Sequence, residues 1–360
     1  MKMEVERKSK NILLRAVAFR ASDIHFVPME KHGIIRFRID GQLVDMDILS
    51  VKLMTKVIGH LKFISGMDVG ERRRPQNSSL QIPLLKESYS MRLSTFPSTL
   101  NETLVIRLFP HDTLQNIHQL AIFPNQANQL LNAIQASAGL FILCGPTGSG
   151  KTTTLYSILD TSFNLLKRNI ITLEDPVEQK RGNFLQMEIN ESAGVTYAEG
   201  LRSLLRHDPD MIMIGEIRDS ETAKMAVRAA LTGHFVVTTL HSKDTLSALK
   251  RLYDLGIESS DLKDTLKAVV AQRLVDLVCP YCRVKCNSYC LKYRDRRRGA
   301  IFEVLSDASL NSALSGNENA LSMKHQKLSH AVNKAVALGF VAEKEIFRMG
   351  KGGYFEKKNI

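Results

Sequence analysis

The chain has 360 residues, of which 44% are hydrophobic and 24% are charged; this composition excludes a disordered polymer and predicts two or three globular domains. No apolar run approaches the roughly 18 residues that a membrane-spanning helix needs, and the charged N-terminus lacks the apolar stretch of a signal peptide. We therefore expect a cytoplasmic protein, in which the five cysteines are reduced or metal-bound. The formal net charge of +12 is compatible with binding to nucleic acid, with binding to an acidic membrane surface, or with a charged surface that only keeps the protein soluble.

The first part of the chain mixes helical and strand patterns. Apolar residues at helical spacing predict a helix over 4–20, and another pattern of this kind predicts a helix over 49–65. Short strands are predicted at 24–27, 34–39, 42–44, 89–95 and 104–108, with Asp40-Gly41 as a hairpin turn. We therefore expect an N-terminal α+β domain over residues 1–110, followed by a linker at 111–118.

From about residue 119 strands and helices alternate. Helices are predicted at 124–138, 152–164, 197–206 and 221–231, and strands at 140–143, 170–173, 211–214 and 235–239. Continuously apolar strands joined by helices are typical of a parallel sheet that is buried on both faces. The sequence therefore predicts an α/β core over residues 119–278.

A phosphate-binding loop follows the first strand of this core. Its glycines let backbone N–H groups turn toward a polyphosphate, and the helix that begins there points its positive end at the anion. Lys151 can reach the β- and γ-phosphates, and the Thr152 hydroxyl can ligate Mg²⁺. The alternative, a glycine-rich turn that happens to contain a lysine, does not account for the full pattern. The residues expected to bind ATP are Gly145, Pro146, Thr147, Gly148, Ser149, Gly150, Lys151, Thr152 and Thr153.

Acidic residues follow two later strands of the core. Glu174 and Asp175 come directly after one apolar run, and Glu216 follows another. Because parallel strands end at one edge of a sheet, we expect these carboxylates beside the phosphate-binding loop, where nucleotide hydrolysis needs acids for Mg²⁺ and for water. The alternative is that both acidic segments are solvated surface turns. His241 ends a third strand and is placed to sense the γ-phosphate; the alternative is a structural role. His234 precedes the same strand.

Residues 279–360 are predicted to form a small C-terminal subdomain with helices around 305–315 and 324–348. Cys279, Cys282, Cys286 and Cys290 could close a tetrahedral structural Zn²⁺ site; reduced thiols or a partial site are the alternatives. Cys144 is interpreted as a small core residue. Basic residues outnumber acidic ones in the first part of this subdomain, which favours a docking patch on this module over a nucleic-acid groove. The basic residues are Arg283, Lys285, Lys292, Arg294, Arg296, Arg297 and Arg298, and the acidic one is Asp295.

Four motifs, in this order and spacing, resemble the signature boxes of the type II secretion and type IV pilus assembly ATPases. They are GPTGSGKTTT at 145–154, ITLEDPVE at 171–178, LRSLLRHDPDMIMIGEIRD at 201–219 and AALTGHFVVTTLHS at 229–242. Segments of the N-terminal part resemble the family too, at 21–25, 38–41, 72–76 and 91–94. The resemblance covers about residues 10–310. In length the chain is similar to the short competence ATPases of Gram-positive bacteria, because it starts almost at the family's second module.

The resemblance implies a RecA-like P-loop core behind a PAS-like α+β domain. It implies that Glu174 polarises the attacking water, that Glu216 works with Mg²⁺ and that His241 relays the nucleotide state. It also implies a homo-hexamer in which Arg92 and Arg107 of one subunit contact the nucleotide site of a neighbouring subunit. The implied function is ATP hydrolysis that powers assembly of a pseudopilus for DNA uptake, at the inner face of the cell membrane and with a polytopic membrane platform protein as partner. Direct nucleic-acid binding is not expected.

The chain departs from the family pattern in three places. Asn77-Ser78-Ser79 stands where Asp-Gly-Arg is usual, so one arginine contact is missing, and Asn101-Glu102 replaces a common Gly-Glu pair. The four C-terminal cysteines lie within twelve residues, whereas longer members separate two Cys-x-x-Cys pairs. Three other functions stay open: a secretion or pilus extension or retraction ATPase, a nucleic-acid motor, and a nucleotide-bound scaffold with little turnover.

Overall fold

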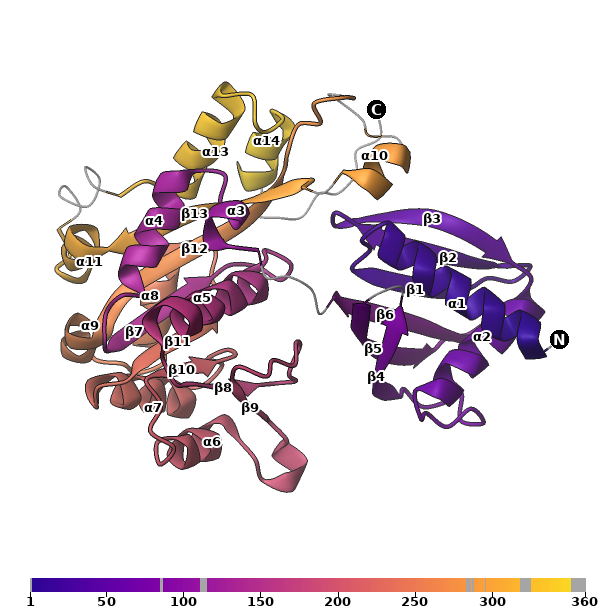
Figure 1. Ribbon diagram of the computed structural model, residues 1–360, viewed down its shortest axis with the longest axis horizontal. Helices are drawn as coiled ribbons and strands as arrows, with labels where there is room; N and C mark the ends of the chain where they lie inside the picture. The colour runs from indigo at the N-terminus through magenta and orange to yellow at the C-terminus, as the bar shows by residue number, and fades with distance from the viewer. Residues whose placement is uncertain are drawn as a thin grey trace. The chain divides into compact units, whose positions relative to one another are not determined.

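The computed structural model describes residues 2–84, 87–110, 115–282, 286, 288–294, 296–317 and 325–350. The chain forms two compact units (Figure 1), one of residues 1–113 with 285–295 and the other of residues 114–284 with 296–360. The fold class is confirmed: both units combine helices with a sheet, and the second has the mostly parallel sheet expected of a P-loop core.

The first unit is a six-stranded antiparallel sheet in the order β3-β2-β1-β6-β5-β4, with two helices on one face. Ile12 of α1 and Met54 of α2 belong to the same buried core as Phe26, Phe37 and Ile106 of the sheet. β4 was not expected from the sequence. The elements are α1 (Lys2–Ala18), β1 (Asp23–Pro28), β2 (Gly33–Ile39), β3 (Gln42–Leu49), α2 (Val51–Ile64), β4 (Asn77–Leu84), β5 (Glu87–Pro97), β6 (Glu102–Pro110) and the short α10 (Ser288–Tyr293).

The second unit is built on a seven-stranded sheet in the order β13-β12-β7-β11-β10-β8-β9. All neighbouring strands are parallel except β12 and β13. The strands are β7 (Gly139–Cys144), β8 (Ile170–Glu174), β9 (Leu185–Glu188), β10 (Met211–Ile214), β11 (Phe235–Leu240), β12 (Leu266–Asp276) and β13 (Arg298–Ser306). The sequence predicted β7, β8, β10 and β11. β13 lies in the range that the sequence assigned to a separate C-terminal subdomain.

Helices cover both faces of this sheet. They are α3 (Ile117–Leu120), α4 (Pro124–Ala133), α5 (Lys151–Leu166), α6 (Tyr197–Leu204), α7 (Ser220–Leu231), α8 (Thr245–Asp254), α9 (Ser259–Thr265), α11 (Asp307–Leu314), α13 (Leu328–Ala337) and α14 (Lys344–Gly350). The helix predicted over 324–348 is two helices among the described residues, because the chain turns at Gly339 with φ of +76° after α13.

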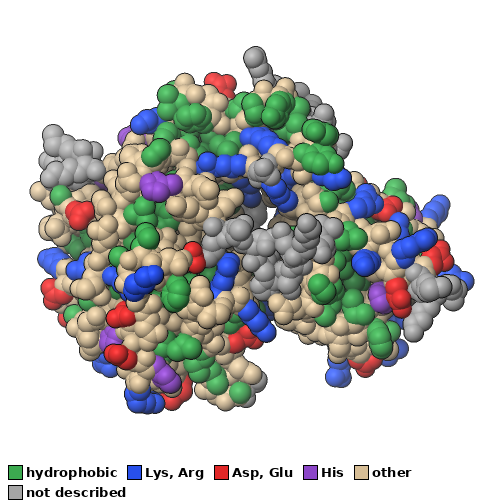
Figure 2. Space-filling view, in the orientation of Figure 1, with side chains coloured by type: hydrophobic (Ala, Val, Ile, Leu, Met, Phe, Trp, Pro, Cys, Tyr) green, Lys and Arg blue, Asp and Glu red, His purple; other side chains and the backbone are tan. Residues whose placement is uncertain are grey.

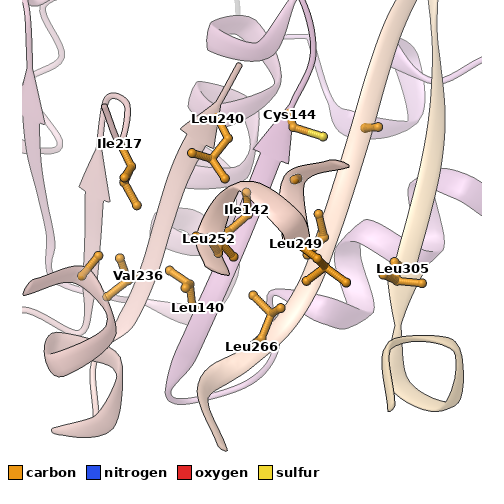
Figure 3. Packing of buried hydrophobic residues seen from close by; sticks show 14 of the residues in the cluster. Leu140, Ile142, Cys144, Ile217, Val236, Leu240, Leu249, Leu252, Leu266 and Leu305 are labelled. Carbon is orange, nitrogen blue, oxygen red and sulfur yellow. The ribbon is translucent and has the colours of Figure 1, made fainter. Parts of the chain in front are cut away.

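Successive residues of each central strand face opposite cores. Leu140, Ile142 and Cys144 of β7 pack in one cluster with Leu249 and Leu252 of α8 (Figure 3). Phe141 and Leu143, the residues between them, pack in the other cluster, which contains the apolar side of α5. A strand buried on both faces needs this continuous apolar run, which is why the sequence pattern identified it. Cys144 is a core residue as expected, and burial raises the pKa of its thiol to about 12.

The basic segment is less uniformly exposed than the sequence suggested. Arg296 donates hydrogen bonds to the carbonyl oxygens of Leu120 (3.2 Å) and Ala121 (2.9 Å), and Arg297 is buried. Arg283, Lys285 and Asp295 lie outside the described residues, as do residues 111–114 of the expected linker. On the visible face of the molecule, lysine and arginine side chains are scattered among acidic and polar ones (Figure 2).

Candidate active site

The phosphate-binding loop lies at the carboxyl end of β7, where the sequence places it. Residues 145–150 connect β7 to α5, which begins at Lys151. Gly145 can only be glycine here, since a Cβ atom would lie 2.6 Å from Ser149 Oγ and 2.7 Å from the backbone oxygen of Gln272. Gly148 has a φ of +77°, which other L-residues rarely adopt. The loop is therefore packed tightly against β12 and turns its backbone at the start of a helix, as an anion site requires.

Polar groups in the loop suit a phosphate ligand. The Lys151 ammonium donates hydrogen bonds to the carbonyl oxygens of Gly145 (2.8 Å) and Pro146 (3.2 Å), and burial lowers its pKa. Within the part of the chain that the structure describes, the buried Ser149 hydroxyl has no hydrogen-bond partner. A buried donor without a partner is costly unless a ligand accepts from it. The loop therefore offers a cation, a free hydroxyl and a helix N-terminus to a polyphosphate.

The predicted acidic and histidine residues follow neighbouring strands. In the order β7-β11-β10-β8, the phosphate-binding loop follows β7, His241 follows β11, Glu216 follows β10 and Glu174 ends β8. These strands are parallel, so all four ends lie at the same edge of the sheet. The structure thus brings together the groups that the sequence predicted for nucleotide hydrolysis.

Glu216 lies between two basic side chains. Its Oε2 is 3.1 Å from His241 Nε2, and its Oε1 accepts a hydrogen bond from Arg218. Burial would raise the pKa of Glu216, but the hydrogen bond and charge of Arg218, with a smaller contribution from His241, lower it. Arg218 also pairs with Asp175 Oδ2 at 3.5 Å. Glu216 is therefore an ionised carboxylate that can serve a cation such as Mg²⁺.

Glu174 has a different environment from Glu216. It is only 3% exposed, and its carboxylate accepts hydrogen bonds from three uncharged side chains, Tyr156, Thr172 and Gln186. The sequence motifs did not single out Tyr156, Gln186 or Arg218. Arg218 stands two residues after Glu216, so its proximity could have been inferred. Tyr156 and Gln186 lie on other elements than Glu174, on α5 and β9, so these contacts depend on how the elements pack.

The two predicted arginines lie in the first unit. Arg92 of β5 is directly opposite Arg107 of β6, and Arg107 is opposite Asp23 of β1. Arg107 Nε donates to Asp23 Oδ1 at 2.9 Å. The row therefore lies on the sheet face opposite the core, because the adjacent residues Leu93 and Ile106 belong to the core. Delivery of Arg92 or Arg107 to a nucleotide stays a prediction.

The four predicted zinc ligands divide between the two units. Cys279 and Cys282 belong to the second unit, where the Cys282 backbone N–H donates to Cys279 Sγ at 3.5 Å, and Cys286 and Cys290 belong to the first. Zinc binding by these four cysteines stays a prediction.

None of the described helices has the length and apolar character that crossing a bilayer requires.

The family model for "Type II/IV secretion system protein" matches residues 2–348. The chain is 45% identical to the competence protein ComGA of Bacillus subtilis over 339 residues, which is 94% of this chain and 95% of that protein. It is 42% identical to the putative type II secretion system protein E of Escherichia coli over 273 residues, 76% of this chain and 55% of that protein.

Among solved structures, the Legionella pneumophila ATPase DotB has the same fold, with a TM-score of 0.73 at 22% identity, and the likeness covers 95% of this chain and 94% of that one. The phosphate-binding loop, the acidic strand ends and the family match agree with one another. The chain belongs to the family of type II/IV secretion system proteins and is an ATP hydrolase of the secretion and pilus assembly type.

Proposed function

We propose that the chain is a hexameric ATPase motor that powers assembly of a competence-type pseudopilus used in DNA uptake. The observation that supports the competence role is the similarity to the Bacillus subtilis competence protein, which extends over both units of this chain. The partner that we propose is a polytopic membrane platform protein, with the motor at the inner face of the cell membrane.

Nucleotide binding follows from the phosphate-binding loop. Lys151 and the backbone N–H groups of residues 147–153 bind the phosphates, helped by the positive end of α5. Thr152 and the ionised Glu216 would hold Mg²⁺, which neutralises charge on the phosphate oxygens when it is bound. The partnerless Ser149 hydroxyl is a further donor for this ligand.

Hydrolysis needs a group that orients water and takes its proton. We assign this to Glu174, the acidic end of the strand next to Glu216. The water oxygen attacks the γ-phosphorus, the bond from that phosphorus to the bridging oxygen breaks, and ADP leaves with that bond's electron pair. Glu174 accepts the proton of the attacking water. His241, bonded to Glu216, would report the state of the phosphate to the rest of the unit.

Further parts of the proposal concern the ring. In a hexamer, Arg92 and Arg107 of one subunit would offset charge on the γ-phosphoryl oxygens of the next. Cys279, Cys282, Cys286 and Cys290 would hold a structural zinc ion that stiffens the segment around residues 279–290.

The competence role is tested in a Gram-positive host that lacks its own competence ATPase. Expression of this chain should restore uptake of labelled DNA, and Lys151→Ala should not, although it accumulates to the same level. Normal uptake with Lys151→Ala would reject the competence assignment. The assignment would also be rejected if the intact chain restores no uptake but restores secretion or filament retraction in a strain deficient in that process.

A further inference from the structure

The carboxylate of Glu174 is held by donors on both oxygens. Oε1 accepts from Thr172 Oγ1 at 2.6 Å and from Gln186 Nε2 at 3.0 Å, while Oε2 accepts from Tyr156 Oη at 2.5 Å. A carboxylate oxygen has about two acceptor positions, so Oε1 is fully used and Oε2 keeps one free position. As far as the described residues show, that position alone is left for a proton from water.

Tyr156 connects this carboxylate to the phosphate-binding helix. It lies on α5, five residues after Lys151, and its side chain is among the largest that are fully buried. Burial and the charge of Glu174 raise its pKa, so the phenol keeps its proton and remains a donor. The other oxygen near the phenol, the Gln179 carbonyl, is farther away at 3.2 Å. The single hydroxyl proton is therefore donated to Glu174.

Gln186 connects the same carboxylate to the edge strand β9. It pairs in register with Thr172 of β8. Its Oε1 accepts the backbone N–H of Arg181 at 2.6 Å, and its Nε2 also donates to the Gln179 carbonyl at 2.9 Å. These backbone partners fix which end of the amide is oxygen, so the NH₂ group must face Glu174.

We propose that Tyr156 and Gln186 are positioning residues for ATP hydrolysis, which act by holding the Glu174 carboxylate in one orientation with a single free acceptor position. This inference rests on the proposed role of Glu174 as the group that takes the proton from water. Because Tyr156 belongs to the helix that begins at the phosphate-binding loop, its bond also sets the distance between that helix and the base. Neither residue needs to contact ATP.

The test uses the full-length protein and compares Tyr156→Phe and Gln186→Met with Tyr253→Phe, which removes the hydroxyl of a tyrosine that is 40% exposed on α8. We expect both site variants to lose about tenfold in kcat, with KM for Mg-ATP within about twofold of the unsubstituted chain, because orientation and not binding is changed. Tyr253→Phe should keep its kcat. The two site substitutions are read independently, so one variant that fails to fold leaves the other to decide.

A fourth variant, Glu174→Gln, separates this inference from the proposed function. Full turnover by Glu174→Gln would show that the base lies elsewhere and would reject both ideas. If Glu174→Gln is inactive but Tyr156→Phe and Gln186→Met keep or exceed the normal kcat, the role of Glu174 stands and the positioning role is wrong. Equal losses in kcat and in nucleotide affinity would also contradict positioning, because they would indicate a general disturbance of the site.

Discussion

Glu216 and Glu174 are the same residue type at the ends of adjacent strands, and their neighbours separate their roles. The Glu216 side chain is 19% exposed and contacts Arg218 and His241, which lower its pKa and suit it to a cation. Glu174 is 3% exposed and contacts only neutral donors in the described structure. Two carboxylates in such different surroundings can serve as a metal ligand and as a partner for water in one reaction.

Glu303 of β13 is a buried carboxylate with a structural role. It accepts from the Thr245 hydroxyl at 2.6 Å and from the Leu328 N–H at 2.8 Å, and His325 Nε2 lies 3.2 Å away. Burial would raise the pKa of Glu303, but the hydrogen bonds of His325, Thr245 and Leu328 lower it from 4.5 to about 2. Its contribution to stability is therefore complete above about pH 4.5 and is lost as the pH falls toward 2.

We expect Glu303→Gln to lower the free energy of unfolding by about 3 kcal/mol at pH 7, which is the order of free energy that corresponds to the lowered pKa of Glu303. The difference from the unsubstituted chain should narrow below about pH 4.5. Urea unfolding at pH 7, 5, 4 and 3 measures it. Glu199→Gln, at an exposed position of α6, is the control. A deficit that stays constant with pH would show that the ionised form of Glu303 is not what stabilises the unit.

Among the elements of the second unit, the sequence predicted four strands with continuous apolar runs and missed strands that contain polar residues. β7, β8, β10 and β11 are buried on both faces, so each reads as an apolar run. β9 has the sequence Leu-Gln-Met-Glu and is an edge strand, and β12 contains Lys267, Gln272 and Arg273. Both strands are specified by pairing with neighbours, β9 with β8 and β12 with β7 and β13, and no local pattern contains that pairing.

The same reason limits what could be predicted of the active site. The phosphate-binding loop, Glu174, Glu216 and His241 each follow a recognisable strand, so their common edge could be inferred. Tyr156 lies inside a helix whose other buried residues are core side chains, and Gln186 belongs to the polar edge strand. Their role depends on the register of β8 with β9 and on the packing of α5 over β8, which only the folded chain shows.

The strand–loop–helix unit at residues 139–166 gives a prediction at this scale. Gly145→Ala would place a Cβ atom 2.7 Å from the Gln272 backbone oxygen, so the loop or β12 must shift. We expect at least a tenfold loss of ATP affinity, about 1.4 kcal/mol, measured with a fluorescent ATP analogue. Gly182→Ala, where a Cβ atom meets no other atom within 4 Å, should bind normally. Normal affinity for Gly145→Ala would mean that the loop adjusts without cost.

At the scale of the whole molecule, the proposal requires that one subunit complete the site of another. The open face of the first unit carries Arg92 and Arg107 in one row, with Asp23 pairing Arg107. An arginine that stabilises charge in phosphoryl transfer contributes roughly 10³-fold or more to kcat. Among the described residues no acidic side chain pairs with Arg92 in this row, so Arg92 is the better candidate of the two for substitution.

We expect Arg92→Ala to lose most ATP turnover and to regain part of it when mixed with Lys151→Ala subunits. In such a mixture an intact loop from one variant meets an intact arginine from the other. Turnover is measured before and after subunit exchange, with Arg7→Ala, at an exposed position of α1, as the control that keeps full activity. If mixing restores nothing, the arginine acts within its own subunit or not at all.

The central claim is that ATP is cleaved at the edge formed by the ends of β7, β11, β10 and β8, with Glu174 taking the proton of water. The most direct measurement is single-turnover hydrolysis by Glu174→Gln at a concentration of enzyme that binds all the ATP. We expect this variant to bind ATP as tightly as the unsubstituted chain and to cleave it at least about a thousandfold more slowly. Cleavage at the normal rate would show that Glu174 does not take the proton.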